Sequence, residues 1–121
     1  GINILVNEMC NGFEKKSINV FPDKINEITD NAIIEDVIMT SKELITNVIK
    51  HSKANEISID VSLIDNQINI IVQDNGIGMK NKNNWGQGLK SIQNRATLYE
   101  GSFDIDSNKS GTTANVKFLI I

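Results

Sequence analysis

Three segments of the chain place their hydrophobic residues at helical spacing. They cover residues 2–14, 32–51 and 89–99, and in each of them apolar side chains recur every three or four positions. This spacing puts the apolar side chains along one stripe of a helix and the polar ones on the opposite side. The third segment is followed by Gly101, and glycine commonly ends helices. The pattern therefore predicts three amphipathic helices.

Patterns typical of strands occupy most of the intervals between these helices. The predicted strands are residues 18–24, 56–65, 67–74, 102–107 and 113–121. The second and third adjoin at Asp65 and Asn66 and predict a hairpin. Pro22 ends the first strand, because proline lacks the N–H that a strand ladder needs. Helices set among mostly antiparallel strands predict an α+β fold: a two-layer sandwich with a mixed, mostly antiparallel sheet and three helices on one face.

The composition is that of an ordinary soluble globular protein. Hydrophobic residues make up 40% of the 121 residues and charged residues 22%, and we expect one domain spanning residues 1–121. The formal charge of −3 and the lack of any run of Lys or Arg argue against nucleic acid as a partner. The apolar runs are too short to span a membrane, so we expect no membrane contact.

The single cysteine and the first residue of the chain add two expectations. Cys10 is the single cysteine, so it cannot form a disulfide within the chain, which suits the reducing cytosol. We interpret it as a small apolar side chain buried on an amphipathic helix. The chain opens at Gly1 without a methionine, so we expect it to be a piece of a larger protein.

Two pairs of closely spaced glycines follow the acid at the end of the strand 67–74. They lie in DNGIGMKNKNNWGQGLKS, residues 74–91. Asn-Gly alone is typical of a hairpin turn, but residues 77–85 do not alternate and are too rich in Asn and Lys for a partner strand. A dinucleotide fingerprint would need a third glycine and a preceding strand, and no Gly-Lys-Ser/Thr loop is present. A glycine pair at the start of a helix favours phosphate, because free N–H groups and the helix dipole meet there.

The long predicted helix carries three polar residues beside its apolar stripe. Glu43 and Asn47 are four residues apart and Lys50 falls on the same side of the helix. A carboxylate, an amide oxygen and an ammonium in this arrangement could supply a base, a Mg²⁺ ligand and a counter-charge for phosphate. The same three residues also fit an ordinary solvated flank of a helix, and both interpretations stay open at this point.

Four motifs, in order, resemble those of the Bergerat-fold ATP-binding domain shared by gyrase-type ATPases, mismatch-repair ATPases and sensor histidine kinases. ELITNVIKH (43–51) resembles the N box, DNGIGM (74–79) the first glycine box, GQGL (86–89) the second, and SGTT (110–113) the final Gly-Thr element. GLKSIQNRATLYEG (88–101) is similar to a helix of the histidine kinases related to nitrate and cell-envelope stress sensors. The resemblance implies a catalytic, ATP-binding domain of a bacterial sensor histidine kinase.

The resemblance also implies a role for the polar motif residues. Asp74 would accept a hydrogen bond from the adenine amine, and Thr112 would join it in recognising the adenine edge. Asn47 would hold Mg²⁺, which keeps most of its shell as water and phosphate oxygens. Glu43 would polarise the nucleophile, and Lys50 would lie near the phosphates.

The remaining motif residues are glycines and their neighbours. Gly76 and Gly78 would let the backbone pass close to base and ribose, because a Cβ there would clash. Gly86 and Gly88 would cradle the phosphates. The resemblance also assigns three further residues to the nucleotide site: Met79, Leu89 and His51. The histidine sits where some relatives carry an aromatic that packs on adenine, and a structural role for it stays open.

The implied activity is transfer of the γ-phosphoryl group of ATP to a histidine, with Mg²⁺ as the second cofactor. Nothing in the chain resembles the His-Asp/Glu motif of a phosphoacceptor, so we expect the acceptor on a separate helical-hairpin domain and a response regulator downstream. The isolated domain is expected to be a cytoplasmic monomer with a short lid at residues 80–85. Two alternatives stay open: a serine kinase of the anti-sigma-factor type, and a nucleotide-dependent interaction module without transfer.

Overall fold

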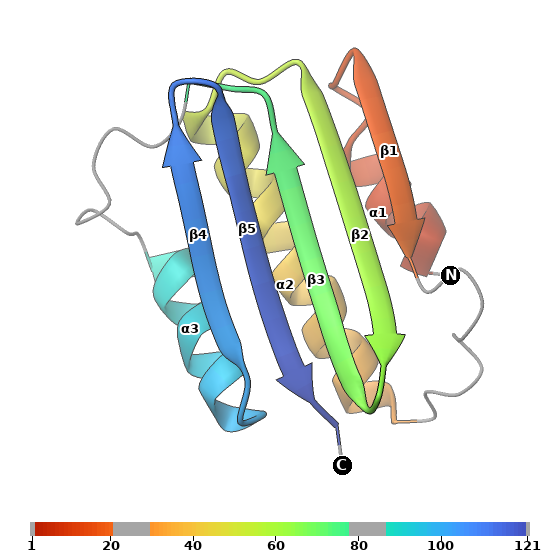
Figure 1. The fold of residues 1–121 in the computed structure, drawn as a ribbon. Helices are drawn as coiled ribbons and strands as arrows, with labels where there is room; N and C mark the ends of the chain where they lie inside the picture. The colour runs from red at the N-terminus through yellow and green to blue at the C-terminus, as the bar shows by residue number, and fades with distance from the viewer. Residues whose placement is uncertain (1, 21–29, 78–86, 121) are drawn as a thin grey trace.

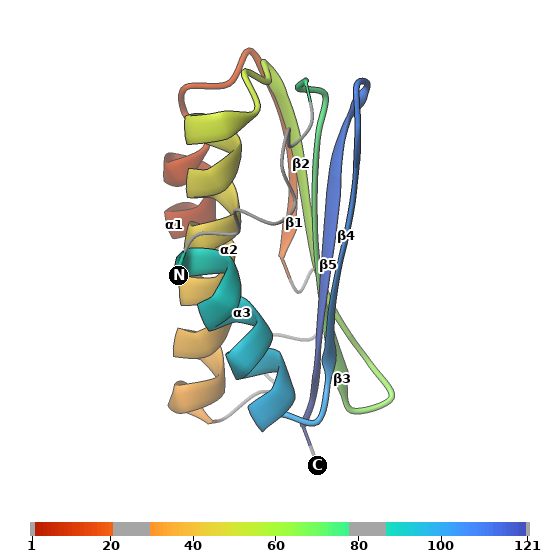
Figure 2. The same ribbon diagram turned by 90° about the vertical axis from the view of Figure 1, so that its left-hand side faces the viewer.

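The computed structural model describes residues 2–20, 30–77 and 87–120. Within these ranges five strands form one sheet and three helices cover one of its faces (Figures 1 and 2). The helices are α1 (Ile2–Met9), α2 (Asn31–His51) and α3 (Gln87–Leu98). The strands are β1 (Lys15–Val20), β2 (Glu56–Ile64), β3 (Gln67–Asp74), β4 (Ser102–Asn108) and β5 (Gly111–Leu119). The predicted two-layer α+β sandwich is confirmed.

The sheet is mixed, and its strand order brings two sequence motifs together. The order is β1-β2-β3-β5-β4, with β1 parallel to β2 and every other pair antiparallel. The last strand of the chain therefore lies between β3 and β4 (Figure 1). In this register Asp74 of β3 pairs with Thr112 of β5, which in turn pairs with Ser107 of β4. The first glycine box and the Gly-Thr element thus meet at one end of the sheet.

The N-terminal elements differ from their predicted bounds. The first helix ends at Met9 and not at residue 14, and β1 begins earlier than predicted, at Lys15. The N–H groups of Glu14 and Lys15 donate to the carbonyl of Asn55, at 2.9 and 3.2 Å. These bonds draw the segment into parallel pairing with β2, which helical spacing in the local sequence could not reveal. Pro22 lies outside the described residues.

The core lies between the sheet and the helices. α1 packs on β1, α2 on β3, and α3 on β4 and β5. All of these elements contribute buried side chains, among them Val6, Ile45, Val72, Ile92 and Phe118. Each such side chain contributes roughly 1.5–3 kcal/mol relative to an exposed position. This packing fixes α2 along the middle of the sheet and sets the place of its polar residues.

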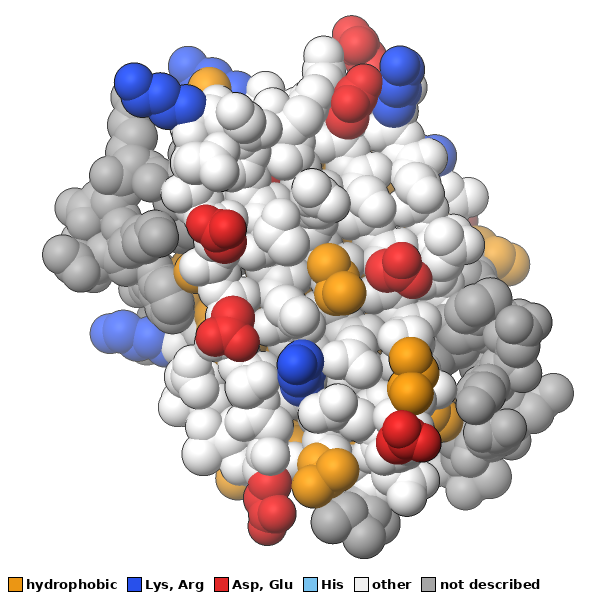
Figure 3. Space-filling view, in the orientation of Figure 1, with side chains coloured by type: hydrophobic (Ala, Val, Ile, Leu, Met, Phe, Trp, Pro, Cys, Tyr) orange, Lys and Arg blue, Asp and Glu red, His pale blue; other side chains and the backbone are white. Residues whose placement is uncertain are grey.

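The other face of the sheet carries no helix in the described part of the chain. Figure 3 shows that face, and scattered charged and hydrophobic side chains interrupt a mostly uncharged polar surface. Hydroxyl and amide side chains such as Gln73, Thr113 and Asn115 line its central strands. No described helix is both long and apolar enough to cross a membrane.

Candidate functional site

Two adjoining cavities lie along α2 where it faces the sheet and α3. The first is mainly apolar, with about 430 Å³ of empty space, part of it open to solvent. The second is more open and more polar, with about 920 Å³. Asn47 and His51 line both cavities, so the two adjoin at these residues. We call the pair the cleft, with an apolar end and a polar end.

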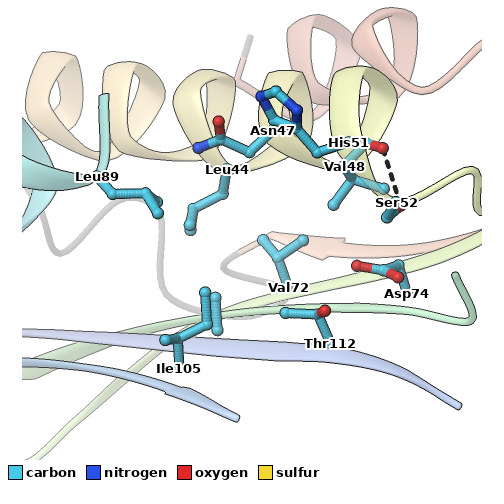
Figure 4. A pocket seen from close by; sticks show the side chains of 11 residues that line it. Leu44, Asn47, Val48, His51, Ser52, Val72, Asp74, Leu89, Ile105 and Thr112 are labelled. Carbon is cyan, nitrogen blue, oxygen red and sulfur yellow. Dashed lines mark hydrogen bonds between the residues drawn. The ribbon is translucent and has the colours of Figure 1, made fainter. Parts of the chain in front are cut away.

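A buried carboxylate marks the apolar end. Figure 4 shows Asp74 and Thr112 on the sheet side of the cavity, opposite Val48 of α2 and Ser52, the C-terminal cap of that helix. Asp74 is 6% exposed, and the N–H of Gly76 donates to its Oδ1 at 2.8 Å. Burial raises the pKa of Asp74, while the amides of Gly76 and Thr112 and the Ser52 hydroxyl oppose the rise. A carboxylate accepts about four hydrogen bonds, so these contacts leave capacity for one further donor on a ligand in the cavity.

Two glycines hold the backbone around this carboxylate. A Cβ on Gly76 would lie 2.2 Å from the carbonyl oxygen of Ser52, which also accepts the Ile77 N–H at 2.8 Å. Gly111 has a φ of +141°, and a Cβ there would lie 2.0 Å from the carbonyl oxygen of Asp74. The close contact at Gly76 is therefore with the C-terminal cap of α2. The close approach of the Gly76 backbone to a ligand stays a prediction. Sequence reasoning did not assign Ser52 or Gly111 to the site.

We expect Gly76→Ala to lower the free energy of unfolding by about 1–3 kcal/mol without any ligand, because the new methyl group overlaps backbone atoms of Ser52. Urea unfolding followed by circular dichroism measures the change. Gly12→Ala is the matched control, because a Cβ there meets nothing within 4 Å, and it should stay within about 0.5 kcal/mol of the unsubstituted chain. Unchanged stability of Gly76→Ala would mean that this glycine serves the ligand alone.

Thr112 is held by a neighbour that sequence reasoning missed. Its Oγ1 lies 2.8 Å from the Oγ of Ser107, and Thr112 itself is 8% exposed. Asp74, Thr112 and Ser107 are consecutive partners across β3, β5 and β4. Asp74 and Thr112 line the apolar cavity and Ser107 continues this polar row across the sheet. Only strand register could have linked Ser107 to the other two.

The polar end brings the three predicted residues of α2 into one cavity. Glu43, Asn47 and Lys50 all line it, and Lys50 is exposed. Among the described residues, Glu43 Oε2 and Asn47 Nδ2 are buried without a hydrogen-bond partner. Burial raises the pKa of Glu43, and the charge of Arg95 opposes the rise. Unpartnered polar atoms at a cavity wall favour a binding surface over a solvated helix flank.

The donor set at the polar end fits Mg²⁺. A half-turn of the Asn47 amide exchanges its nitrogen and oxygen, so the unpartnered position can present an oxygen. No cluster of three His, Cys, Asp or Glu side chains suited to a metal occurs in the described ranges. Mg²⁺ retains several waters and is commonly held by one or two protein oxygens together with phosphates. One amide oxygen beside a phosphate-sized space is consistent with that pattern.

The start of α3 completes the polar end. α3 begins at Gln87, and the first N–H groups of a helix lack intrahelical partners and attract anions. The nearest heavy atom to a Cβ built on Gly88 would be Asn47 Nδ2, at 3.9 Å, so glycine leaves a gap between the two helices.

The other predicted site residues divide between the two ends. Leu89 is 3% exposed and lines the apolar cavity, whereas His51 is exposed at the junction of the two. Gly78, Met79 and Gly86 lie outside the described residues, so the structure does not place them. The described part of the cleft therefore combines an apolar slot, a buried acceptor and a polar mouth beside a helix start.

A family model described as "Histidine kinase-, DNA gyrase B-, and HSP90-like ATPase" matches residues 32–120. The chain belongs to this family, which confirms the family predicted from the four motifs. Membership in an ATPase family implies that the chain binds a nucleotide.

Relatives of similar sequence are named as sensor proteins. Sensor histidine kinase YvfT of Bacillus subtilis is 32% identical over 80% of this chain and 25% of its own length. The nitrate/nitrite sensor protein NarX of Escherichia coli is 31% identical over 64% of this chain and 13% of its own length. The chain thus spans a quarter or less of these relatives.

A solved structure shares the fold. The histidine kinase domain from the Erythrobacter litoralis EL346 blue-light activated histidine kinase has a TM-score of 0.74 to this chain at 14% identity. The similarity covers 98% of this chain and 61% of that one. At this level of identity the likeness establishes the architecture and no more.

Proposed function

We propose that this chain binds Mg-ATP and transfers the γ-phosphoryl group to a histidine of a separate phosphoacceptor domain. The observation that carries the proposal is the cleft itself, whose apolar end holds the buried Asp74 and whose polar end holds unpartnered atoms of Glu43 and Asn47. In this proposal adenine binds at the first end and the triphosphate at the second. The kinship with sensor histidine kinases supports the choice of acceptor.

Each end of the cleft has a task in nucleotide binding. Asp74 accepts a hydrogen bond from the exocyclic amine of adenine, and Thr112 contributes its hydroxyl to the same edge of the base. Leu89 supplies an apolar contact, since it lines the same cavity. Lys50 and the start of α3 at Gly88 attract the phosphates, because both line the polar cavity and carry positive charge or free N–H groups.

Phosphoryl transfer requires mainly positioning and charge neutralisation from the protein. An imidazole nitrogen of the acceptor attacks the γ-phosphorus, the bond to the β,γ-bridging oxygen breaks, and ADP leaves with that electron pair. Glu43 polarises the attacking imidazole by accepting a hydrogen bond from it. Asn47 would hold Mg²⁺, and the ion would supply positive charge to the phosphate oxygens. His51 is exposed at the mouth and serves as a contact for the nucleotide, not as the acceptor.

The proposal includes the setting of the reaction. The acceptor histidine belongs to a helical hairpin of the parent kinase, and a response regulator takes the phosphoryl group from it. The domain acts in the cytoplasm, as the intracellular part of a sensor. Because the nucleophile is brought by a partner, holding ATP and acceptor in one complex supplies much of the rate.

The expected result is transfer only in the presence of the acceptor. The chain alone, incubated with Mg²⁺ and radiolabelled ATP, should bind ATP without labelling itself. Adding a hairpin fragment of the parent kinase should give an acid-labile, base-stable label on that fragment. A fragment whose acceptor histidine is replaced by glutamine is the control and should stay unlabelled. Acid-stable label on a serine would favour a serine kinase, and ATP binding without any transfer would favour an interaction module.

A further inference from the structure

Arg95 of α3 contacts one face of α2 beside the polar cavity. Its Nε lies 3.4 Å from Asp36 Oδ1, and its Nη1 lies 3.1 Å from Thr40 Oγ1 and 3.9 Å from Glu43 Oε2. Side chains three or four residues apart project from the same side of a helix. The Arg95 side chain is 12% exposed, so a largely buried cation lies between the two helices that border the phosphate end of the cleft.

The orientation of this guanidinium is fixed by contacts on several sides. Asp36 forms the ion pair with Arg95 through one carboxylate oxygen and accepts a hydrogen bond from the Tyr99 hydroxyl with the other. Arg95 Nη2 also lies 3.4 Å from Ser91 Oγ. Burial and the bond to Asp36 raise the pKa of Tyr99 to about 12, so its hydroxyl remains a donor at neutral pH. A planar group held at Nε and at both terminal nitrogens has little freedom to turn.

The contact with Glu43 is of a different kind. A distance of 3.9 Å between Nη1 and Oε2 is too long for a hydrogen bond, although it is close enough for strong attraction between charges. Within the described residues Oε2 has no hydrogen-bond partner. Arg95 therefore stabilises the ionised carboxylate without occupying the lone pairs of that oxygen. The buried oxygen thus keeps its lone pairs unused among the described residues, while the charge of Arg95 holds the carboxylate in place.

We propose that Arg95 is a positioning residue that holds Glu43 ionised and oriented for phosphoryl transfer. This role rests on the proposed function, because Glu43 acts on the nucleophile there. α3 contributes both Gly88, at the polar cavity, and Arg95, so one helix sets the phosphate end and the carboxylate together. A change in how α3 lies against α2 would move both at once.

A double-mutant cycle on Arg95 and Glu43 tests the proposal. ATP affinity is measured by calorimetry, and the rate of label transfer to the hairpin fragment is measured at saturating ATP. Arg95→Met should lower the transfer rate by about tenfold, as part of the 10²–10⁴-fold contribution of a positioned base is lost, and ATP affinity should stay within about twofold. In a Glu43→Gln background Arg95→Met should have almost no further effect, since two residues that act as a unit are not additive.

The controls separate this role from general support of the fold. Lys117→Met removes the same charge from the helix-free face of the sheet and should leave transfer unchanged, and Arg95→Lys should restore part of the rate. Equal losses in both Glu43 backgrounds, or a loss of ATP affinity that matches the loss of transfer, would overturn the role of Arg95 and leave the proposed function standing. If the unsubstituted chain does not transfer, the proposed function fails and the role of Arg95 in transfer fails with it.

Discussion

Asp74→Asn should weaken ATP binding by about 5–150-fold and at the same time make the ligand-free domain more stable. The binding loss follows because an Asn amide can turn a donor toward the donating amine of adenine, and an unmatched buried polar pair costs about 1–3 kcal/mol. The gain in stability follows because burial raises the pKa of Asp74. Asn has the same shape and carries no charge to desolvate.

The sign of the stability change follows from proton binding. Because burial raises the pKa of Asp74 in the folded state above that of the unfolded chain, the folded state binds more protons than the unfolded chain at pH values between the two pKa values. Stability contributed by Asp74 therefore falls as pH rises through this window. Above this window the buried carboxylate carries its charge and its burial lowers stability, a loss that Asn does not suffer.

Calorimetry with ATP and urea unfolding at pH 7 measure the two effects. Asp60→Asn is the matched control, because Asp60 is an exposed carboxylate on β2 and the substitution is chemically the same. Guanine carries a carbonyl where adenine carries its amine, so the unsubstituted chain should disfavour GTP, and Asp74→Asn should reduce that preference. Equal affinity of the unsubstituted chain for ATP and GTP would contradict the role of Asp74.

The sequence predicted the elements that depend on local pattern. The spacing of apolar residues located α2 and the β2–β3 hairpin closely, because a buried face imposes its period on each of them. It failed at the end of the first helix, where Glu14 and Lys15 bond to Asn55. These bonds join segments far apart in the chain, so the local spacing of apolar residues could not predict them.

The candidate site divides in the same way. Glu43, Asn47 and Lys50 could be grouped from helical spacing alone, and the cavity that they share agrees with that grouping. The sequence predicts that a Cβ at Gly76 would clash. The residue it would clash with in the structure, Ser52, is found only once β3 packs beside the end of α2. Contacts between elements are set by packing and register, so residue types and spacing do not reveal them.

Glu43→Gln should leave ATP bound and reduce transfer to the hairpin fragment by about 100-fold or more, since a positioned base commonly contributes 10²–10⁴-fold. The amide keeps the shape of the side chain and loses the acceptor charge at Oε2, which is buried and without a hydrogen-bond partner among the described residues.

Asn47→Ala should behave differently and lose the part of ATP affinity that depends on Mg²⁺. Calorimetry with Mg²⁺ and with EDTA, followed by single-turnover transfer, separates the two effects. Glu35→Gln, an exposed position on the same helix, is the control and should match the unsubstituted chain. If Glu43→Gln and Asn47→Ala both transfer normally, these residues are an ordinary polar flank of α2 and the base and metal ligand lie elsewhere.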